Sequence, residues 1–303
     1  MSTRKTQINQ EIVLGFLQKK FKNITYFEPL EGGEISRPFS FKVGDEEFVI
    51  RIDTEVKTFE KDKYAFEHFA SDKIPIPEMI EFGKMDNKYF YAITRRSVGD
   101  TLDHLTKESV RMILPQLIQT LDEIHKVRIP MHGKYGDWNA DGNARFDTWK
   151  EYLLSIGYEK YFGWSNLFKN SFMEEEVFAK TYKRIKKAVA FCPKERFLIH
   201  GDYGFNNLLT DKERITGVID WGESKYGDFL YDVAWLSFWT KDIDYEKEFY
   251  KFYKKKNADV SNYKEKLLCY KLHLGLGAIH FFVNSNQEKS YKWTRDRILS
   301  FLI

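Results

Sequence analysis

Hydrophobic residues in the first third of the chain follow two different spacings. Segments 8–20 and 59–71 place apolar side chains every three or four residues, which predicts helices. Between and after them, short runs alternate apolar with polar residues or are bounded by turn residues, as strands are. The predicted strands span 24–30, 39–43, 47–52, 80–83 and 88–96. The pattern indicates a small antiparallel sheet with one inserted helix.

Beyond Gly99 the spacing becomes mainly helical. It predicts helices over 109–127, 147–156, 173–191, 228–239 and 264–283. Pro115 falls inside the first of them, so it either kinks that helix or marks its start. We therefore expect an α+β protein of two lobes, with residues 1–98 forming the sheet lobe and 99–303 a larger, mostly helical lobe.

Composition and charge narrow the classes of function. With 43% hydrophobic and 31% charged residues, the 303-residue chain has enough apolar material for a sizeable core. A net charge of +3 gives no reason to expect nucleic acid, whereas residues 211–250 hold ten acidic and five basic side chains. Such a local excess of negative charge favours a cationic ligand. Two cysteines without paired spacing exclude a disulfide scaffold and a cysteine zinc site.

The N-terminus is polar, and no apolar run approaches the roughly 18 residues that cross a bilayer. We therefore expect a cytoplasmic protein that does not bind membranes. We also expect a monomer.

The segment HGDYGFNNLL, residues 200–209, places polar side chains directly after an apolar run. The turn at 211–214 and the run at 215–219 then predict a hairpin. Antiparallel pairing would bring Asn207 and Asp220 together at its open end, with Asp202 just upstream. Carboxylate and amide oxygens suit Mg²⁺. An Asx turn is the alternative for Asp202 taken alone.

Together these motifs resemble the aminoglycoside phosphotransferase family. The Asp-x4-Asn spacing at 202–207 and the Asp-Trp-Gly at 220–222 match the kinase catalytic loop and metal-binding Asp. His-Gly-Asp at 200–202 and Gly-Asp-Phe-Leu-Tyr-Asp at 227–232 also fit the family, and the resemblance runs from about residue 30 to 240. It implies a protein-kinase-like fold and an ATP- and Mg²⁺-dependent O-phosphotransferase. The expected acceptor is an aminoglycoside, and hygromycin B is the preferred candidate. Phosphorylation would confer resistance to the antibiotic. GTP is an alternative to ATP as the nucleotide.

The resemblance also implies roles for the central residues. Asp202 would accept the proton of the attacking hydroxyl, while Asn207 and Asp220 would hold Mg²⁺ against the phosphates. His200 is expected to brace the loop rather than to take part in the chemistry.

Nucleotide-binding residues are expected in the first lobe. The loop at 31–37, which includes Ser36, would curl backbone N–H groups over phosphates, although a plain hairpin turn is the alternative. Arg51 stands where kinases have a lysine and would pair with a phosphate. Asp62 is preferred over Glu67 as its helix partner. Arg95 and Ser97 lie in the predicted hinge at 94–97, whose backbone would bind adenine.

Acidic and indole side chains after Asp220 suit an aminocyclitol, since carboxylates bind ammonium groups and rings bind sugar faces. Glu223 and Trp239 are the preferred substrate residues. Asp228, Asp232 and Trp235 are also candidates, with a bracing role as the alternative for the two aspartates and a core position for the tryptophan.

Three other functions stay open. A kinase of the same fold could act on choline, a sugar, fructosamine or another antibiotic. The fold could also serve as an inactive, nucleotide-binding pseudokinase. His-x-Asp at 200–202 further suggests a metal hydrolase, although too few additional ligands can be placed from the sequence.

Overall fold

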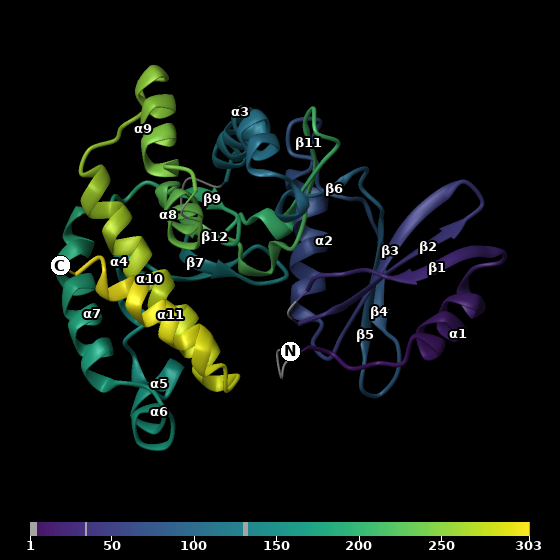
Figure 1. The fold of residues 1–303 in the computed structure, drawn as a ribbon, viewed down its shortest axis with the longest axis horizontal. Coiled ribbons are helices and arrows are strands. Elements are labelled where there is room, and N and C mark those ends of the chain that lie inside the picture. The colour runs from purple at the N-terminus through teal and green to yellow at the C-terminus, as the bar shows by residue number, and fades with distance from the viewer. Residues whose placement is uncertain (1–4, 34, 130–132, 241, 303) are drawn as a thin grey trace. The chain divides into compact units, whose positions relative to one another are not determined.

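The computed structural model describes residues 5–33, 35–129, 133–240 and 242–302 (Figure 1). Its backbone divides into two compact units. Counting only these described residues, the sheet unit comprises those within 1–124, 139–142 and 205–222. The helical unit comprises those within 125–138, 143–204 and 223–303. The expected lobes, 1–98 and 99–303, are a different division based on spacing along the chain, and they stay a prediction.

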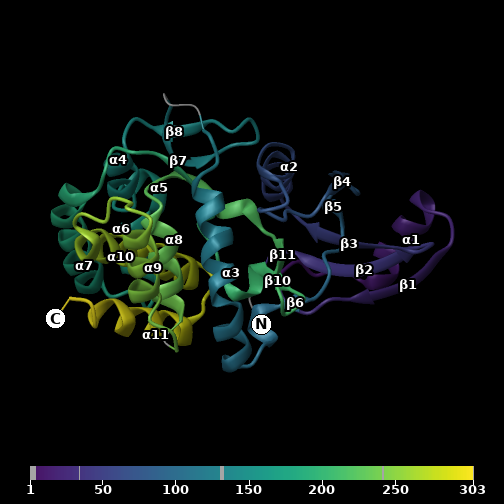
Figure 2. The same ribbon diagram turned by 90° about the horizontal axis from the view of Figure 1, so that it is seen from above.

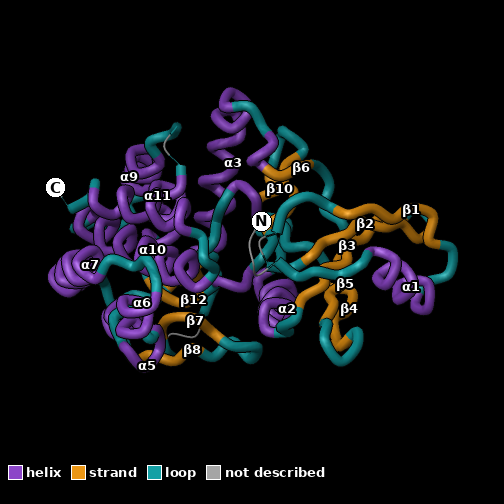
Figure 3. The backbone as a smooth tube through the Cα atoms, turned by 60° about the horizontal axis from the view of Figure 1, so that its bottom comes forward, coloured by secondary structure: helices purple, strands orange, loops and turns teal. Residues whose placement is uncertain are grey.

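The sheet unit contains a five-stranded antiparallel sheet, drawn in orange in Figure 3. In spatial order its strands are β1 (Ile24–Pro29), β2 (Arg37–Val43), β3 (Glu46–Asp53), β5 (Phe90–Arg95) and β4 (Met79–Lys84). Helix α1 (Gln10–Lys20) precedes the sheet and α2 (Lys57–Phe69) follows β3. The predicted antiparallel sheet with an inserted helix is confirmed.

The alternation of β3 decides which side chains reach the core. Phe48 and Ile50 are buried in one hydrophobic cluster with Val13 and Leu17 of α1. Because neighbouring strand residues point to opposite faces, Arg51 lies on the other face of the sheet. Its guanidinium carbon there lies 5.2 Å from the centre of the Phe59 ring of α2.

The predicted hairpin is present in the sheet unit and carries a third strand. Strands β11 (Ile215–Val218), β10 (Leu208–Thr210) and β6 (Asp100–Thr101) form this small sheet in that order. Short 3₁₀ turns, η1 (Leu102–His104) and η3 (Phe205–Asn207), flank it, and η4 (Trp221–Glu223) follows the hairpin.

Helix α3 (Lys107–His125) contains Pro115 in its interior. The alternative that Pro115 marks the start of the helix is therefore wrong, because the first two turns form before it. A proline inside a helix removes one backbone hydrogen bond and perturbs the preceding turn.

The helical unit has a small sheet of its own, in the order β8 (Ala144–Phe146), β7 (Tyr135–Trp138), β12 (Lys225–Gly227) and β9 (Phe197–Ile199). Its helices are α4 (Trp149–Ser155), α5 (Glu159–Phe162), α6 (Trp164–Asn170), α7 (Glu175–Ala188, continued by η2, Val189–Phe191), α8 (Leu230–Trp239), α9 (Tyr245–Lys255), α10 (Tyr263–Asn284) and α11 (Glu288–Leu299).

Helix α10 packs against α7, α8 and α11 at the centre of the helical unit (Figure 2). It is long and apolar enough to cross a membrane by length and composition alone. Twelve of its residues are buried within the protein, including Leu267, Tyr270 and Leu276, which is the behaviour of a core helix. The expected α+β class, with an antiparallel sheet followed by a mostly helical part, is confirmed.

Candidate active site

The hairpin register brings two predicted metal ligands to the same end. Leu208 pairs with Val218, and the backbone N–H of Ile219 donates to the carbonyl of Asn207 at 3.0 Å. Asp220 therefore directly follows Ile219, the residue whose backbone pairs with Asn207. Its φ of +61° is left-handed, a conformation that aspartate tolerates better than most residues.

The chemistry of this pair fits magnesium. Asn207 offers an amide oxygen and Asp220 a carboxylate, both from the sheet unit. Mg²⁺ is commonly held by one or two such protein oxygens, with phosphate and water completing its octahedron. These two residues could therefore hold the metal of a nucleotide complex.

Asp62 connects Arg51 to the segment that follows the metal pair. One carboxylate oxygen of Asp62 accepts from Nη2 of Arg51, and the other accepts from the backbone N–H of Trp221 at 2.8 Å. Glu67, the alternative partner, instead pairs with Lys63. Burial alone would lower the pKa of Arg51, but the carboxylates of Asp62 and Asp220 raise it overall, so its guanidinium stays charged.

Lys61 makes a second link that the sequence did not indicate. Its buried ammonium donates to the carbonyl of Gly222 at 2.6 Å. Consecutive residues of α2, Lys61 and Asp62, thus fasten the backbone on both sides of Trp221. Nothing in the spacing of the sequence distinguishes this lysine from the solvated lysines of other helices.

Two residues of the glycine-rich loop between β1 and β2 have left-handed backbone conformations. Gly32 and Gly33 have φ of +96° and +67°, and a Cβ on Gly33 would lie 2.8 Å from the carbonyl oxygen of Ser36. Glu34 lies outside the described residues. The loop therefore needs glycine at 33, while its contact with phosphate stays a prediction.

Two residues of the predicted hinge use their backbone N–H groups for hydrogen bonds within the sheet. The backbone N–H of Arg95 donates to the carbonyl of Glu78 at 2.9 Å, and its guanidinium pairs with Glu46 and Glu78. The N–H of Arg96 donates to the carbonyl of Glu47 at 2.9 Å. Both donors are used inside the sheet, so a nucleotide base would have to reach other hinge groups than these.

Ser97 lies against the hairpin that precedes Asp220 instead. A Cβ on Gly217 of β11 would come within 2.8 Å of Oγ of Ser97, and Oγ of Thr216 donates to the carbonyl of Val98 at 2.5 Å. The hinge and the hairpin are thus packed directly together within the sheet unit.

Asp202 belongs to the helical unit, on a loop held by its own backbone. The N–H of Asp202 donates to Nδ1 of His200 at 3.3 Å, and the N–H of Gly204 donates to the carbonyl of Asp202 at 2.7 Å. His200 is fully buried, so it braces the loop as expected.

Asp232 also holds the loop that carries Asp202. Its carboxylate accepts from the N–H of His200 at 3.0 Å and from the N–H of Gly201 at 2.7 Å. Nε2 of His125 lies 3.0 Å from the same carboxylate, a partner that the sequence did not indicate. Asp232 is 0% exposed, which favours the bracing role over direct contact with a substrate.

Asp228 is equally buried. It accepts from the hydroxyl of Tyr270 at 2.6 Å and from the N–H of Leu230 at 3.2 Å, and Lys266 lies 4.0 Å away. Burial raises the pKa of Asp228, against the opposing effects of Lys266 and Tyr270. This aspartate also fits bracing better than substrate binding.

Glu223 stands directly beside the Asp202 loop. A Cβ on Gly201 would lie 2.1 Å from the carbonyl oxygen of Glu223, so only glycine permits this approach. The buried ammonium of Lys225 donates to that carbonyl at 2.5 Å and lies 3.8 Å from the Glu223 carboxylate and 3.3 Å from that of Asp137. Both carboxylates are largely exposed, so they are available to a cationic ligand.

Trp235 and Trp239 are both half-buried on α8, with ring centroids 6.0 Å apart. Trp235 is therefore not a fully enclosed core residue. The structure thus places the predicted nucleotide and metal residues in the sheet unit and Asp202 with the substrate candidates in the helical unit.

Comparisons with known proteins identify the family of this chain. Residues 27–259 match the model of the phosphotransferase enzyme family. The chain is 29% identical over 297 residues to the hygromycin-B 4-O-kinase of Escherichia coli, covering 97% of this chain and 85% of that protein.

Solved structures show the same fold. The aminoglycoside phosphotransferase APH(4)-Ia, in ternary complex with ADP and hygromycin B, is 28% identical, with a TM-score of 0.85 over 95% of this chain and 97% of that one. The APH(2")-IIa structure with gentamicin is 18% identical, with a TM-score of 0.68 over 97% of each chain, and supports the fold alone. The chain is therefore a member of the phosphotransferase enzyme family, of the aminoglycoside kinase type.

Proposed function

We propose that this enzyme transfers the γ-phosphoryl group of ATP to a hydroxyl of hygromycin B. The observation that carries the proposal is the hairpin register that places Asp220 next to the partner of Asn207. The similarity to a hygromycin-B kinase, and to a structure that holds ADP and hygromycin B, supports the choice of nucleotide and acceptor.

Each residue has a role that follows from phosphoryl transfer, in which positioning and neutralisation of charge supply most of the catalysis. Asp202 accepts a hydrogen bond from the acceptor hydroxyl and takes its proton. Asn207 and Asp220 hold Mg²⁺, which neutralises phosphate charge. Arg51, kept charged by Asp62, binds a phosphate oxygen of the nucleotide.

Acceptor recognition is assigned to the helical unit. Glu223 presents an exposed carboxylate beside the Asp202 loop, and its backbone is held by Lys225. An ammonium group of the aminocyclitol binds this carboxylate, and sugar faces contact Trp235 and Trp239. We also propose that the enzyme is cytoplasmic and monomeric.

A coupled assay of ADP formation tests the proposal. ATP and GTP are each supplied with hygromycin B, other aminoglycosides, choline and fructosamine, with and without Mg²⁺. We expect Mg²⁺-dependent turnover with ATP and hygromycin B, and growth of a susceptible host on the antibiotic. Turnover with choline alone would identify choline, instead of hygromycin B, as the acceptor. Nucleotide binding without any turnover would favour an inactive pseudokinase.

A further inference from the structure

A third tryptophan joins the pair on α8. The ring of Trp293, on α11, lies almost parallel to that of Trp239, with centroids 5.5 Å apart and an interplanar angle of 6°. Trp235 also adjoins Trp239, with ring centroids 6.0 Å apart. Trp293 is 40% exposed, which is unusual for so large an apolar ring.

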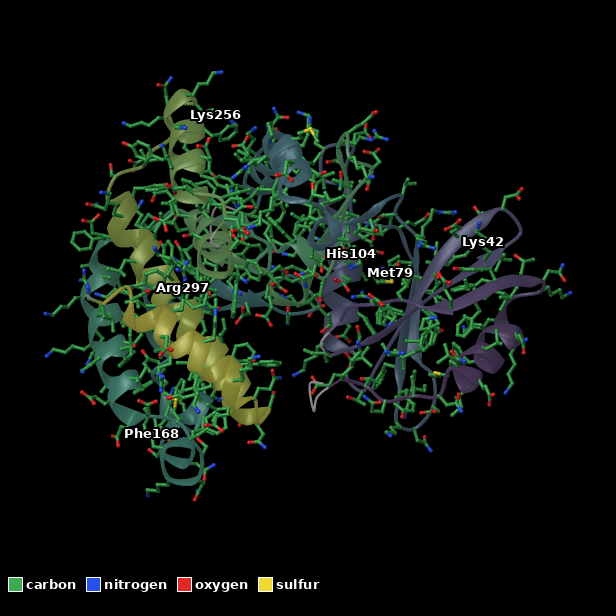
Figure 4. The ribbon with its side chains drawn as sticks, in the orientation of Figure 1. Lys42, Met79, His104, Phe168, Lys256 and Arg297 are labelled. Atoms are coloured by element: carbon green, nitrogen blue, oxygen red, sulfur yellow. The ribbon has the colours of Figure 1, made fainter. Side chains whose placement is uncertain are left out.

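Helix α11 is fixed to the end of α8 by more than this stacking. Arg297 of α11, labelled in Figure 4, donates from Nε to the carbonyl of Phe238 at 3.1 Å and from Nη2 to that of Ser237 at 2.7 Å. These carbonyls belong to the last turn of α8, where helical partners are lacking. Because α11 contacts α8 at Ser237, Phe238 and Trp239, the position of Trp293 is set by the fold.

The stacked rings are connected to the catalytic loop through α8 itself. Asp232, which accepts from the N–H groups of His200 and Gly201, is seven residues before Trp239. Residues seven apart lie on nearly the same helix face, and at 1.5 Å per residue they are about 10 Å apart along the axis. All of these residues belong to the helical unit.

We propose that Trp293 is a substrate-binding residue that, with Trp239 and Trp235, forms an indole platform for an amino-sugar ring remote from the acceptor hydroxyl. The inference rests on the proposed function, since the occupant is the aminoglycoside itself. Indole faces attract ammonium groups and pack against apolar sugar faces. One exposed indole offers far less area than the roughly 800 Å² that each partner of a stable protein interface buries, which favours a small ligand.

Steady-state kinetics of Trp293→Ala and Trp293→Phe test this role. For the alanine variant we expect the KM for hygromycin B to rise about 3- to 30-fold, with kcat and the KM for ATP within twofold of wild type. The phenylalanine variant should fall between, because it keeps a ring face. Tyr250→Ala is the matched control, since Tyr250 is also 40% exposed in the helical unit but lies against Tyr263 on another helix.

A binding measurement separates this inference from the proposed function. In the Asp202→Asn background, where turnover should be strongly slowed, hygromycin B should quench tryptophan fluorescence, and Trp293→Ala should weaken the titrated affinity by the same factor as the KM. A wild-type KM and affinity in a folded Trp293→Ala protein would overturn the platform. Absence of turnover by the wild-type enzyme with every aminoglycoside would instead overturn the proposed function.

Discussion

The backbone N–H of Gly201 donates to Oδ1 of Asp232 at 2.7 Å, which joins the loop that carries Asp202 to the first turn of α8. The second carboxylate oxygen is shared by the N–H of His200 and the imidazole of His125. A fully buried carboxylate with this many donors is stabilised by charge-assisted hydrogen bonds. The geometry of the predicted base therefore depends on a residue that need not touch a substrate.

Asp232→Asn should accordingly impair both folding and turnover. The amide has one acceptor oxygen where the carboxylate has two, so at least one buried N–H loses its partner, at a cost of about 1–3 kcal/mol. We expect a lower Tm and a kcat reduced by about 10- to 100-fold. Thermal melts and the coupled assay measure these effects, with Asp259→Asn, at an exposed loop aspartate, as control. A wild-type kcat would show that the loop is held by other contacts.

Asp202→Asn isolates the proposed proton transfer. The amide keeps the size of the side chain but cannot accept a proton, so turnover should fall by roughly 10²–10⁴-fold. The KM for ATP should stay near its wild-type value, because that residue is not assigned to nucleotide binding. Nearly normal turnover in the coupled assay would remove Asp202 as the base.

Asp220→Ala tests the metal assignment separately. It removes the carboxylate from the hairpin pair and leaves only the amide oxygen of Asn207, so Mg²⁺-supported nucleotide binding should be lost. Isothermal titration with ATP, with and without Mg²⁺, measures this directly. Asp211→Ala, at the turn of the same hairpin, should titrate like the wild type. An unchanged Mg²⁺ dependence in Asp220→Ala would rule out its role as a ligand.

Asp62→Asn should destabilise the sheet unit, because it leaves the guanidinium of Arg51 without its carboxylate partner. Breaking a buried ion pair from one side costs about 3 kcal/mol or more. Glu67→Gln provides the comparison, since the Lys63–Glu67 pair is exposed and should contribute less than about 1 kcal/mol. Urea unfolding measures both differences. Equal effects of the two substitutions would contradict the importance assigned to burial.

His273 predicts a loss of stability in mild acid. Burial lowers its pKa from 6.5 to about 3, aided by the charge of Lys225 and opposed by Asp137. Below pH 6.5 the unfolded chain therefore binds a proton that the folded chain excludes. The contribution of neutral His273 to the free energy of unfolding is therefore fully present above pH 6.5. It declines toward pH 3 by about 1.4 kcal/mol per pH unit.

Urea unfolding between pH 7.5 and 5 measures how the free energy of unfolding changes with pH. His273→Gln should reduce this slope by the equivalent of about one proton taken up on unfolding. His104→Gln is the control, because Asp100 raises the pKa of that exposed imidazole and its small contribution has the opposite sign. The same pH slope in wild type and His273→Gln would show that the imidazole is protonated in the folded protein.

The sequence predicted the parts of the site that depend on local pattern. Strand alternation and turn residues were sufficient to place Asn207 and Asp220 on one hairpin, since register follows from the turn. Lys61 and His125 were missed because their partners, Gly222 and Asp232, are distant along the chain. Lys225 was missed because nothing in the sequence shows that its ammonium is buried. Strands as short as β7 and β12, with four and three residues, show too little alternation to be recognised.

Gly217 has a consequence that reaches beyond its own strand, β11. A methyl group there would lie 2.8 Å from Oγ of Ser97, so a bulkier residue requires a displacement of Ser97 or of β11. Since Asp220 lies only three residues further along, a displacement of β11 is transmitted to the proposed cation ligand. A single hydrogen atom at position 217 therefore helps to set the spacing between the predicted hinge and the proposed magnesium ligand.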